Sequence, residues 1–134
     1  MSFEVLNHIA RKKAGMHVLC NLISRDLEGQ AKHNANWKDR TSNARQGLKG
    51  GVEGGPNLYS IYLSHGVDYG EILEEGSKPH IIKPKNKKAL YWKGAAHPVK
   101  QVHHPGTKGF KTIENTLKNN KPLVIQRITD YWSD

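Results

Sequence analysis

Apolar residues recur at three- and four-residue steps through the first quarter of the chain, which is the spacing of one face of an α-helix. The stripe contains Phe3, Leu6, Ile9, Met16, Leu19, Ile23, Leu27 and Ala31. Charged and polar residues occupy the opposite positions. The pattern predicts a long helix within residues 1–34 whose apolar face is covered by another part of the protein.

Residues 35–57 are polar and rich in glycine, and they show no period. The composition predicts a loop that is functional, partly disordered or shaped by a partner. Alternation of apolar and polar residues then begins in "LYSIYLSHG", which predicts a half-buried strand. Val52 is a candidate for a preceding strand that pairs with it through the turn "GGPN". Residues 58–104 are therefore expected to form a sheet.

The segment "DYGEILEEG" predicts a short helix over residues 69–75, with Asp68 as the N-cap and Gly76 as the stop. Further short strands are expected at Lys88–Trp92 and Pro98–His104. Residues 110–133 are helical again, with a break before Pro122, which would begin the last helix.

The order of elements predicts a single α+β domain over residues 1–134. We expect a long N-terminal helix, a mainly antiparallel sheet of about four strands with the short helix inserted, and a C-terminal helix packed on one face.

The composition indicates that other chains contribute to stability. Only 36% of the 134 residues are hydrophobic, which is low for a self-sufficient globular domain. The one cysteine, Cys20, cannot form an intramolecular disulfide and indicates a reducing compartment. No apolar run approaches the ~18 residues of a membrane span, and the N-terminus lacks the apolar core of a signal peptide. We therefore expect no membrane partner and a protein made and used inside the cell.

The net charge of +9 is unevenly distributed. Nine lysines and no acidic residue lie between Gly76 and Ile113. Lysine is a strongly hydrated point charge, whereas arginine gives the planar fork used to read bases. The lysine run therefore indicates either a solvated face, which we favour, or non-specific contact with phosphates.

Three glutamates, Glu71, Glu74 and Glu75, share one face of the predicted short helix. A catalytic carboxylate would instead need an apolar pocket that raises its pKa, so we expect these three to be solvated. Their mutual repulsion calls for basic partners. Candidates in the same chain or in a neighbouring copy are Lys83, Lys85, Lys87 and Lys88.

The histidines do not follow the spacing of a zinc site, and His103 and His104 would point to opposite faces of a strand. We therefore expect no metal, no cofactor and no catalytic residue. A small basic protein with histidines and lysines could also bind or cleave RNA, and this alternative stays open.

Several segments together resemble the neck, or head–tail joining, proteins of tailed bacteriophages. "AKHNANWKDRTSNARQGL" is similar to the family pattern "A…aPW.dRTGnAR.GL", with Ser42 where the family has glycine. "LYSIYLSHGVDYGEILEEG" resembles its strand followed by "YG.YLE.G". "IIKPKNKKAL" and "HHPGTKGFKTIENTL" resemble its later segments, with Lys108–Gly109–Phe110 replacing Arg-Pro-Phe. The resemblance covers residues 31–117, and the family is distantly related to the Z-like minor tail proteins of phage lambda.

The resemblance implies a structural virion protein without enzymatic activity. It would be assembled in the bacterial host cytoplasm into a ring of six or twelve copies around the double-stranded DNA channel. Its neighbours would be the portal-side connector and the tail terminator or tail tube proteins. Trp37, Arg40, Thr41 and Arg45 would form a loop that contacts a partner. Lys100, Lys108 and Lys111 are the candidates for contact with DNA phosphates.

Overall fold

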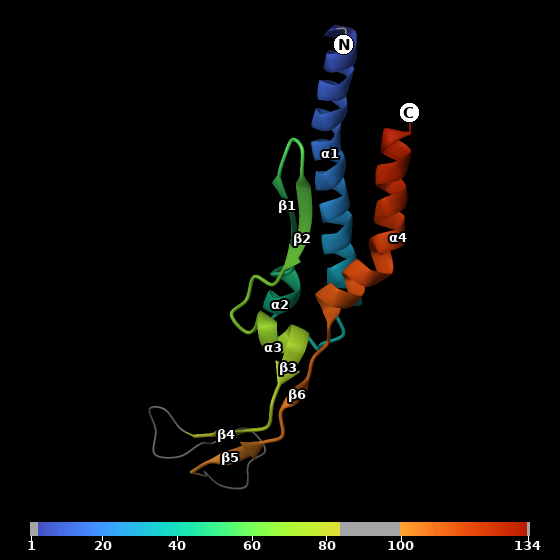
Figure 1. Ribbon diagram of the computed structural model, residues 1–134. Helices are drawn as coiled ribbons and strands as arrows, with labels where there is room; N and C mark the ends of the chain where they lie inside the picture. Colours follow the sequence, from blue (N-terminus) through green and yellow to red (C-terminus); the bar gives the residue numbers. More distant parts are fainter. Residues whose placement is uncertain (1–2, 84–99, 134) are drawn as a thin grey trace.

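The longest element is the helix α1 (Phe3–Asn34), against which a β-hairpin and the C-terminal helix pack (Figure 1). The computed structural model describes residues 3–83 and 100–133. The hairpin of β1 (Lys49–Gly54) and β2 (Tyr59–Ser64) lies along one side of α1, and α4 (Thr112–Trp132) lies along the other. The predicted N-terminal helix and the α+β class are confirmed.

The strands form three separate antiparallel pairs in the described residues, and not the single four-stranded sheet that we expected. β1 pairs with β2, β3 (Gly76–Ser77) with β6 (Thr107–Lys108), and β4 (His80–Ile82) with β5 (Val102–His104). After α3 (Gly70–Glu75) the chain leads away from α1, so the later strands do not reach the β1–β2 hairpin (Figure 1). The strand predicted at Lys88–Trp92 lies outside the described residues.

The segment 35–57, predicted to be a loop, contains the short helix α2 (Asn43–Gln46) and all of β1. It also supplies much of the core, because Ala35, Trp37, Ala44 and Leu48 are buried against Ala31 of α1. Its glycines are required by packing: a Cβ on Gly50 would lie 2.2 Å from the carbonyl oxygen of Ser24 in α1. This segment lacks a hydrophobic period because its glycines allow close contact between backbones. The prediction that Val52 lies on a strand paired with the next one is confirmed.

The C-terminal helix packs on α1, and not on a sheet face as we expected. Arg127 forms an ion pair with Asp26 (2.7 Å). Near the end of α4, the hydroxyl of Tyr131 donates to the carbonyl of Lys12 (2.6 Å), and Nζ of Lys12 donates to the carbonyl of Tyr131 (2.7 Å).

Pro122 does not begin a separate helix, as predicted, but lies inside α4. Proline lacks the N–H of one helical hydrogen bond and crowds the preceding turn, which bends a helix without ending it. Figure 1 shows that α4 changes direction along its length.

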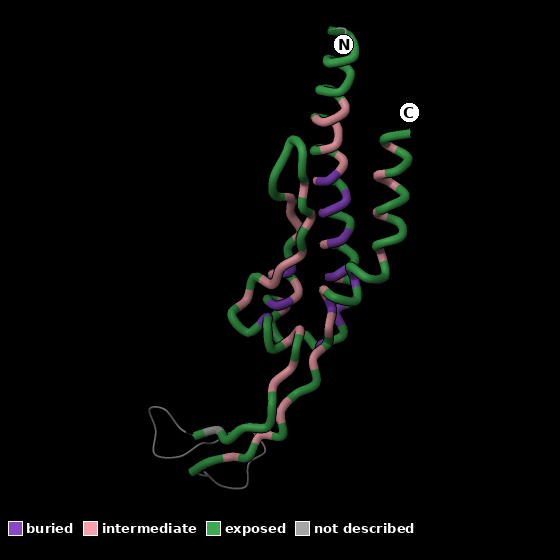
Figure 2. Tube along the Cα trace, in the orientation of Figure 1, coloured by how far each residue is buried: buried purple, intermediate pink, exposed green. Residues whose placement is uncertain are grey.

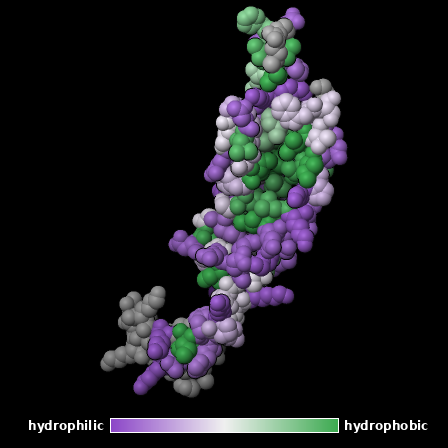
Figure 3. Space-filling model, viewed as in Figure 1, coloured by the Kyte–Doolittle hydropathy of each residue, from purple (hydrophilic) through white to green (hydrophobic). Residues whose placement is uncertain are grey.

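A large part of the apolar surface of the described residues is uncovered. The burial of α1 is confined to its middle and C-terminal parts (Figure 2). Toward its N-terminus the same apolar stripe is exposed, with Phe3 84% and Leu6 47% accessible. Figure 3 shows apolar side chains gathered in a hollow between the β1–β2 hairpin and α4. The hydrophobic content is low, and the described helices and strands leave part of the apolar core exposed to solvent.

Candidate functional site

Arg45 holds the end of α1 and the segment that follows it together through hydrogen bonds. Its guanidinium donates hydrogen bonds to the backbone carbonyls of Lys32, Ala35 (3.0 Å) and Trp37 (3.3 Å). Its Nε also pairs with the carboxylate of Asp39 at 2.9 Å. We call residues 37–45 with these bonds the Arg45 clasp. Only arginine has the planar fork of donors that such a set of carbonyls requires.

The clasp divides the four residues predicted to contact a partner. Trp37 is 7% exposed, and Arg45 is engaged within the chain. Arg40 and Thr41 are exposed, so they are the two that a partner can reach directly.

Ser42, inside the clasp, has a left-handed backbone conformation (φ 63°, ψ 4°). This conformation costs a residue with a Cβ about 1–2 kcal/mol, whereas glycine adopts it freely. A glycine at this position would adopt the same conformation without this cost.

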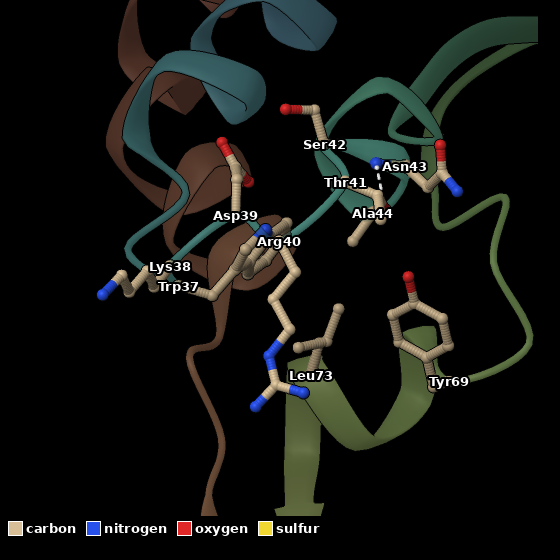
Figure 4. Close-up of a pocket in the computed structure, with 10 residues that line it drawn as sticks. All are labelled: Trp37, Lys38, Asp39, Arg40, Thr41, Ser42, Asn43, Ala44, Tyr69 and Leu73. Atoms are coloured by element: carbon tan, nitrogen blue, oxygen red, sulfur yellow. Dashed lines mark hydrogen bonds between the residues drawn. The ribbon is translucent and has the colours of Figure 1, made fainter. Parts of the chain in front are cut away.

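A pocket of about 310 Å³ lies between the clasp and the start of α3 (Figure 4). Its walls combine the apolar surfaces of Trp37, Ala44 and Leu73 with the polar groups of Arg40 and Tyr69. Tyr69 is 47% exposed at its edge. Apolar walls edged by charged and polar groups, which also include those of Lys38 and Asp39, are suited to hold a side chain of another protein.

Glu74 is not solvated, contrary to our expectation. Its side chain is 13% exposed, and its two carboxylate oxygens accept the backbone N–H groups of Ile113 (2.9 Å) and Glu114 (3.0 Å). The residue before α4, Lys111, has no capping side chain, so a carboxylate from α3 takes over this task. Nε2 of His65 lies 3.1 Å from the same carboxylate. Glu74 thereby joins α3, α4 and the residue that follows β2.

The surroundings of Glu74 set its charge. Burial raises the pKa of this carboxyl, but the hydrogen bonds from Glu114, Ile113 and His65 outweigh burial and lower the pKa below its ordinary value. A lowered pKa keeps the carboxylate ionised, as a helix cap requires. A general acid would need the opposite shift.

The other two glutamates remain at the surface. Glu75 pairs with Lys111, and this contact raises the pKa of the lysine. Lys111 therefore has an acidic partner within its own chain, and its predicted contact with phosphate stays a prediction. Glu71 is exposed. Of the lysines expected to face the glutamates, Lys83 is exposed, while Lys85, Lys87 and Lys88 lie outside the described residues.

The basic part of the chain forms an arm. β4 and β5 project from the body beyond β3 and β6 (Figure 1), and we call residues 78–83 and 100–108 the basic arm. Its four lysines, Lys78, Lys83, Lys100 and Lys108, are all exposed. His80 stacks on His104 across the two strands, with ring centroids 4.8 Å apart.

Sequence reasoning missed two features of the site, and one of them left a signal. The sequence before α4 offers no serine, threonine, aspartate or asparagine as a cap immediately before Thr112. The missing cap could have directed attention to a carboxylate elsewhere. The bonds of Arg45 to backbone carbonyls leave no pattern in the sequence.

The described residues include no group of three or more histidines, cysteines, aspartates or glutamates that could hold a metal ion. None of the described helices combines the length and apolar character needed to cross a membrane. Comparison of the chain with protein-family models, with curated proteins and with solved structures finds no match.

Proposed function

We propose that this chain is a structural subunit of the neck of a tailed bacteriophage. It would form a ring of six or twelve copies that joins the portal-side connector to the tail terminator or tail tube, around double-stranded DNA. In this proposal it has no enzymatic activity and no cofactor.

The observation that carries the proposal is the Arg45 clasp. The segment most similar to the phage pattern, "WKDRTSNAR", folds as one unit in which the arginine binds the aspartate and the tryptophan carbonyl. The left-handed residue of this unit, Ser42, stands at the glycine of the pattern. The resemblance thus coincides with a physical unit of the structure, and this coincidence supports the proposal.

The uncovered apolar surface also supports the proposal. The hollow beside α1 and its exposed N-terminal end fit a subunit whose core is completed by neighbouring chains. Identical subunits joined head to tail form a closed ring when the rotation between them closes. The pocket beside the clasp and the exposed Glu71 are the surfaces that we assign to contact with adjoining proteins.

The test uses the phage that encodes the chain. An early stop codon in the gene should give DNA-filled heads and separate tails that do not join, as seen by electron microscopy. Supplying the wild-type gene from a plasmid should restore joining. Joined particles in the absence of the protein would refute the proposal.

Point variants then test the surface. Arg40→Ala in the pocket should impair joining, whereas Lys118→Ala, a matched loss of one exposed charge on α4, should not. Equal joining by both variants would remove the pocket from the interface. Cleavage of RNA by the purified protein, lost in His103→Ala or His104→Ala, would instead establish the alternative function.

A further inference from the structure

Among the described residues, the lysines of the basic arm have no ion-pair partner. The ion pairs of the described residues involve Glu28, Asp39, Glu74, Glu75, Glu114 and Asp26, and none of them includes a lysine of the arm. The sequence contains no acidic residue between Gly76 and Ile113. Because the arm stands apart from the body, its positive charge is available to an external polyanion.

The shape of the arm favours nucleic acid over a folded acidic protein. A two-stranded ribbon is narrow enough to lie against a duplex or to enter its major groove. The arm offers lysines and no arginine, so it suits phosphate oxygens more than base edges.

The stacked histidines add a proton-dependent charge. Nδ1 of His80 lies 2.7 Å from the carbonyl of Lys78, which can only accept, so this nitrogen carries the proton of the neutral ring. Nε2 of His80 is therefore free to take up a second proton without loss of a hydrogen bond. His104 differs, because its Nδ1 accepts the N–H of Gly106 at 3.0 Å and would lose this bond on protonation.

The charged neighbours of His80 in the described arm are all basic: Lys78 and Lys83 beside it, His104 and His103 on β5, and Lys100 just before β5. A phosphate bound among these groups would meet basic side chains only. Uptake of a proton by His80 and binding of a phosphate therefore favour each other.

We propose that the basic arm binds the phosphate backbone of double-stranded DNA without sequence preference, and that a proton on His80 strengthens this binding. The choice of duplex DNA among polyanions rests on the proposed function. The contacts themselves follow from the lysines and the histidine pair.

The first experiment measures binding of the full-length protein to a fluorescent duplex of random sequence by anisotropy. Each phosphate contact changes the slope of log affinity against log salt by about 0.9. If all four lysines contact phosphates, affinity should fall roughly 100-fold between 50 and 200 mM salt. The variant K78Q/K83Q/K100Q/K108Q should lose most of this slope.

A matched control separates the arm from overall charge. The variant K38Q/K49Q/K118Q/K121Q removes the same number of exposed lysines from the body and should bind nearly as wild type. The proposal is overturned if both variants bind alike, if one DNA sequence is strongly preferred, or if polyglutamate binds more tightly than DNA.

The second experiment repeats the measurement between pH 8 and pH 6, the range in which histidine changes its charge. One added contact should raise wild-type affinity about eightfold at 0.1 M salt. His80→Gln should remove this rise, whereas His103→Gln, an exposed histidine on the facing strand, should keep it. An unchanged rise in His80→Gln would overturn the role of His80.

Head–tail joining is scored separately in phage that carry the arm variant. Joined particles together with lost DNA binding would retain the proposed function and support the proposal for the arm. Joined particles in the stop-codon phage, together with arm-dependent DNA binding by the purified protein, would refute the proposed function and leave the proposal for the arm standing.

Discussion

Replacing Glu74 should destabilise the protein far more than replacing the neighbouring Glu71. Glu74 accepts two backbone N–H groups of α4 and the ring N–H of His65, from a position that is 13% exposed. Hydrogen bonds to a charged group are worth about 1.5–3 kcal/mol each, and they are not additive. We expect Glu74→Ala to lower the free energy of unfolding by about 3 kcal/mol.

Glu74→Gln keeps the shape but loses the charge and places an amide NH₂ where an acceptor is needed. We expect it to cost about 2 kcal/mol, against less than about 0.5 kcal/mol for the exposed control Glu71→Gln. Urea unfolding followed by far-ultraviolet circular dichroism measures both changes. Equal midpoints for the two variants would refute the assignment of Glu74 as the cap of α4.

The same carboxylate gives a pH signature. Its pKa in the folded protein lies below the ordinary value of 4.5. Its contribution is therefore complete above about pH 4.5 and is lost as the pH falls through the lowered folded pKa. Wild-type stability should decline in this acid range more steeply than that of Glu74→Gln. Parallel declines would show that the hydrogen bonds do not favour the ionised form.

Three further substitutions and one chemical reaction test separate features. Ser42→Gly should raise the free energy of unfolding by about 1 kcal/mol, because glycine adopts the left-handed conformation without strain; a loss of stability would contradict it. Gly50→Ala should lower the free energy of unfolding by about 2 kcal/mol, because the added Cβ would meet the backbone of α1. Gly29→Ala should raise it by about 1 kcal/mol in thermal unfolding, because an added Cβ there would have no atom within 4 Å. Cys20 is 1% exposed and burial raises its pKa, so Ellman's reagent should modify it only as fast as the protein opens; reaction at the rate of an exposed thiol would contradict the packing.

The periodic parts of the chain could be predicted, and the aperiodic parts could not. The stripe from Phe3 to Ala31 and the alternation from Tyr59 to Leu63 each follow one backbone repeat, so their elements were predicted correctly. β1 has no such alternation, because Gly50 and Gly51 replace side chains where the strand approaches α1 and Tyr62.

The candidate site depended on contacts between distant residues. The spacing of Glu71, Glu74 and Glu75 predicts that they share one face of a helix. Only the structure shows that the first turn of α4 packs against Glu74 and shields it from water. The role of Arg45 could not be predicted either, because its acceptors are backbone carbonyls, which every residue possesses.

The length of α1 has a consequence for how the protein can respond to its surroundings. Its 32 residues rise by about 48 Å, and the basic arm lies beyond the end opposite to Phe3 (Figure 1). At physiological ionic strength the field of an exposed charge decays over about 8 Å. A proton or a counterion gained at the arm is therefore not felt electrostatically at the apolar N-terminal end. A mutation or a change of pH or salt can therefore alter the charge of the arm without changing the electrostatic potential at the N-terminal end of α1.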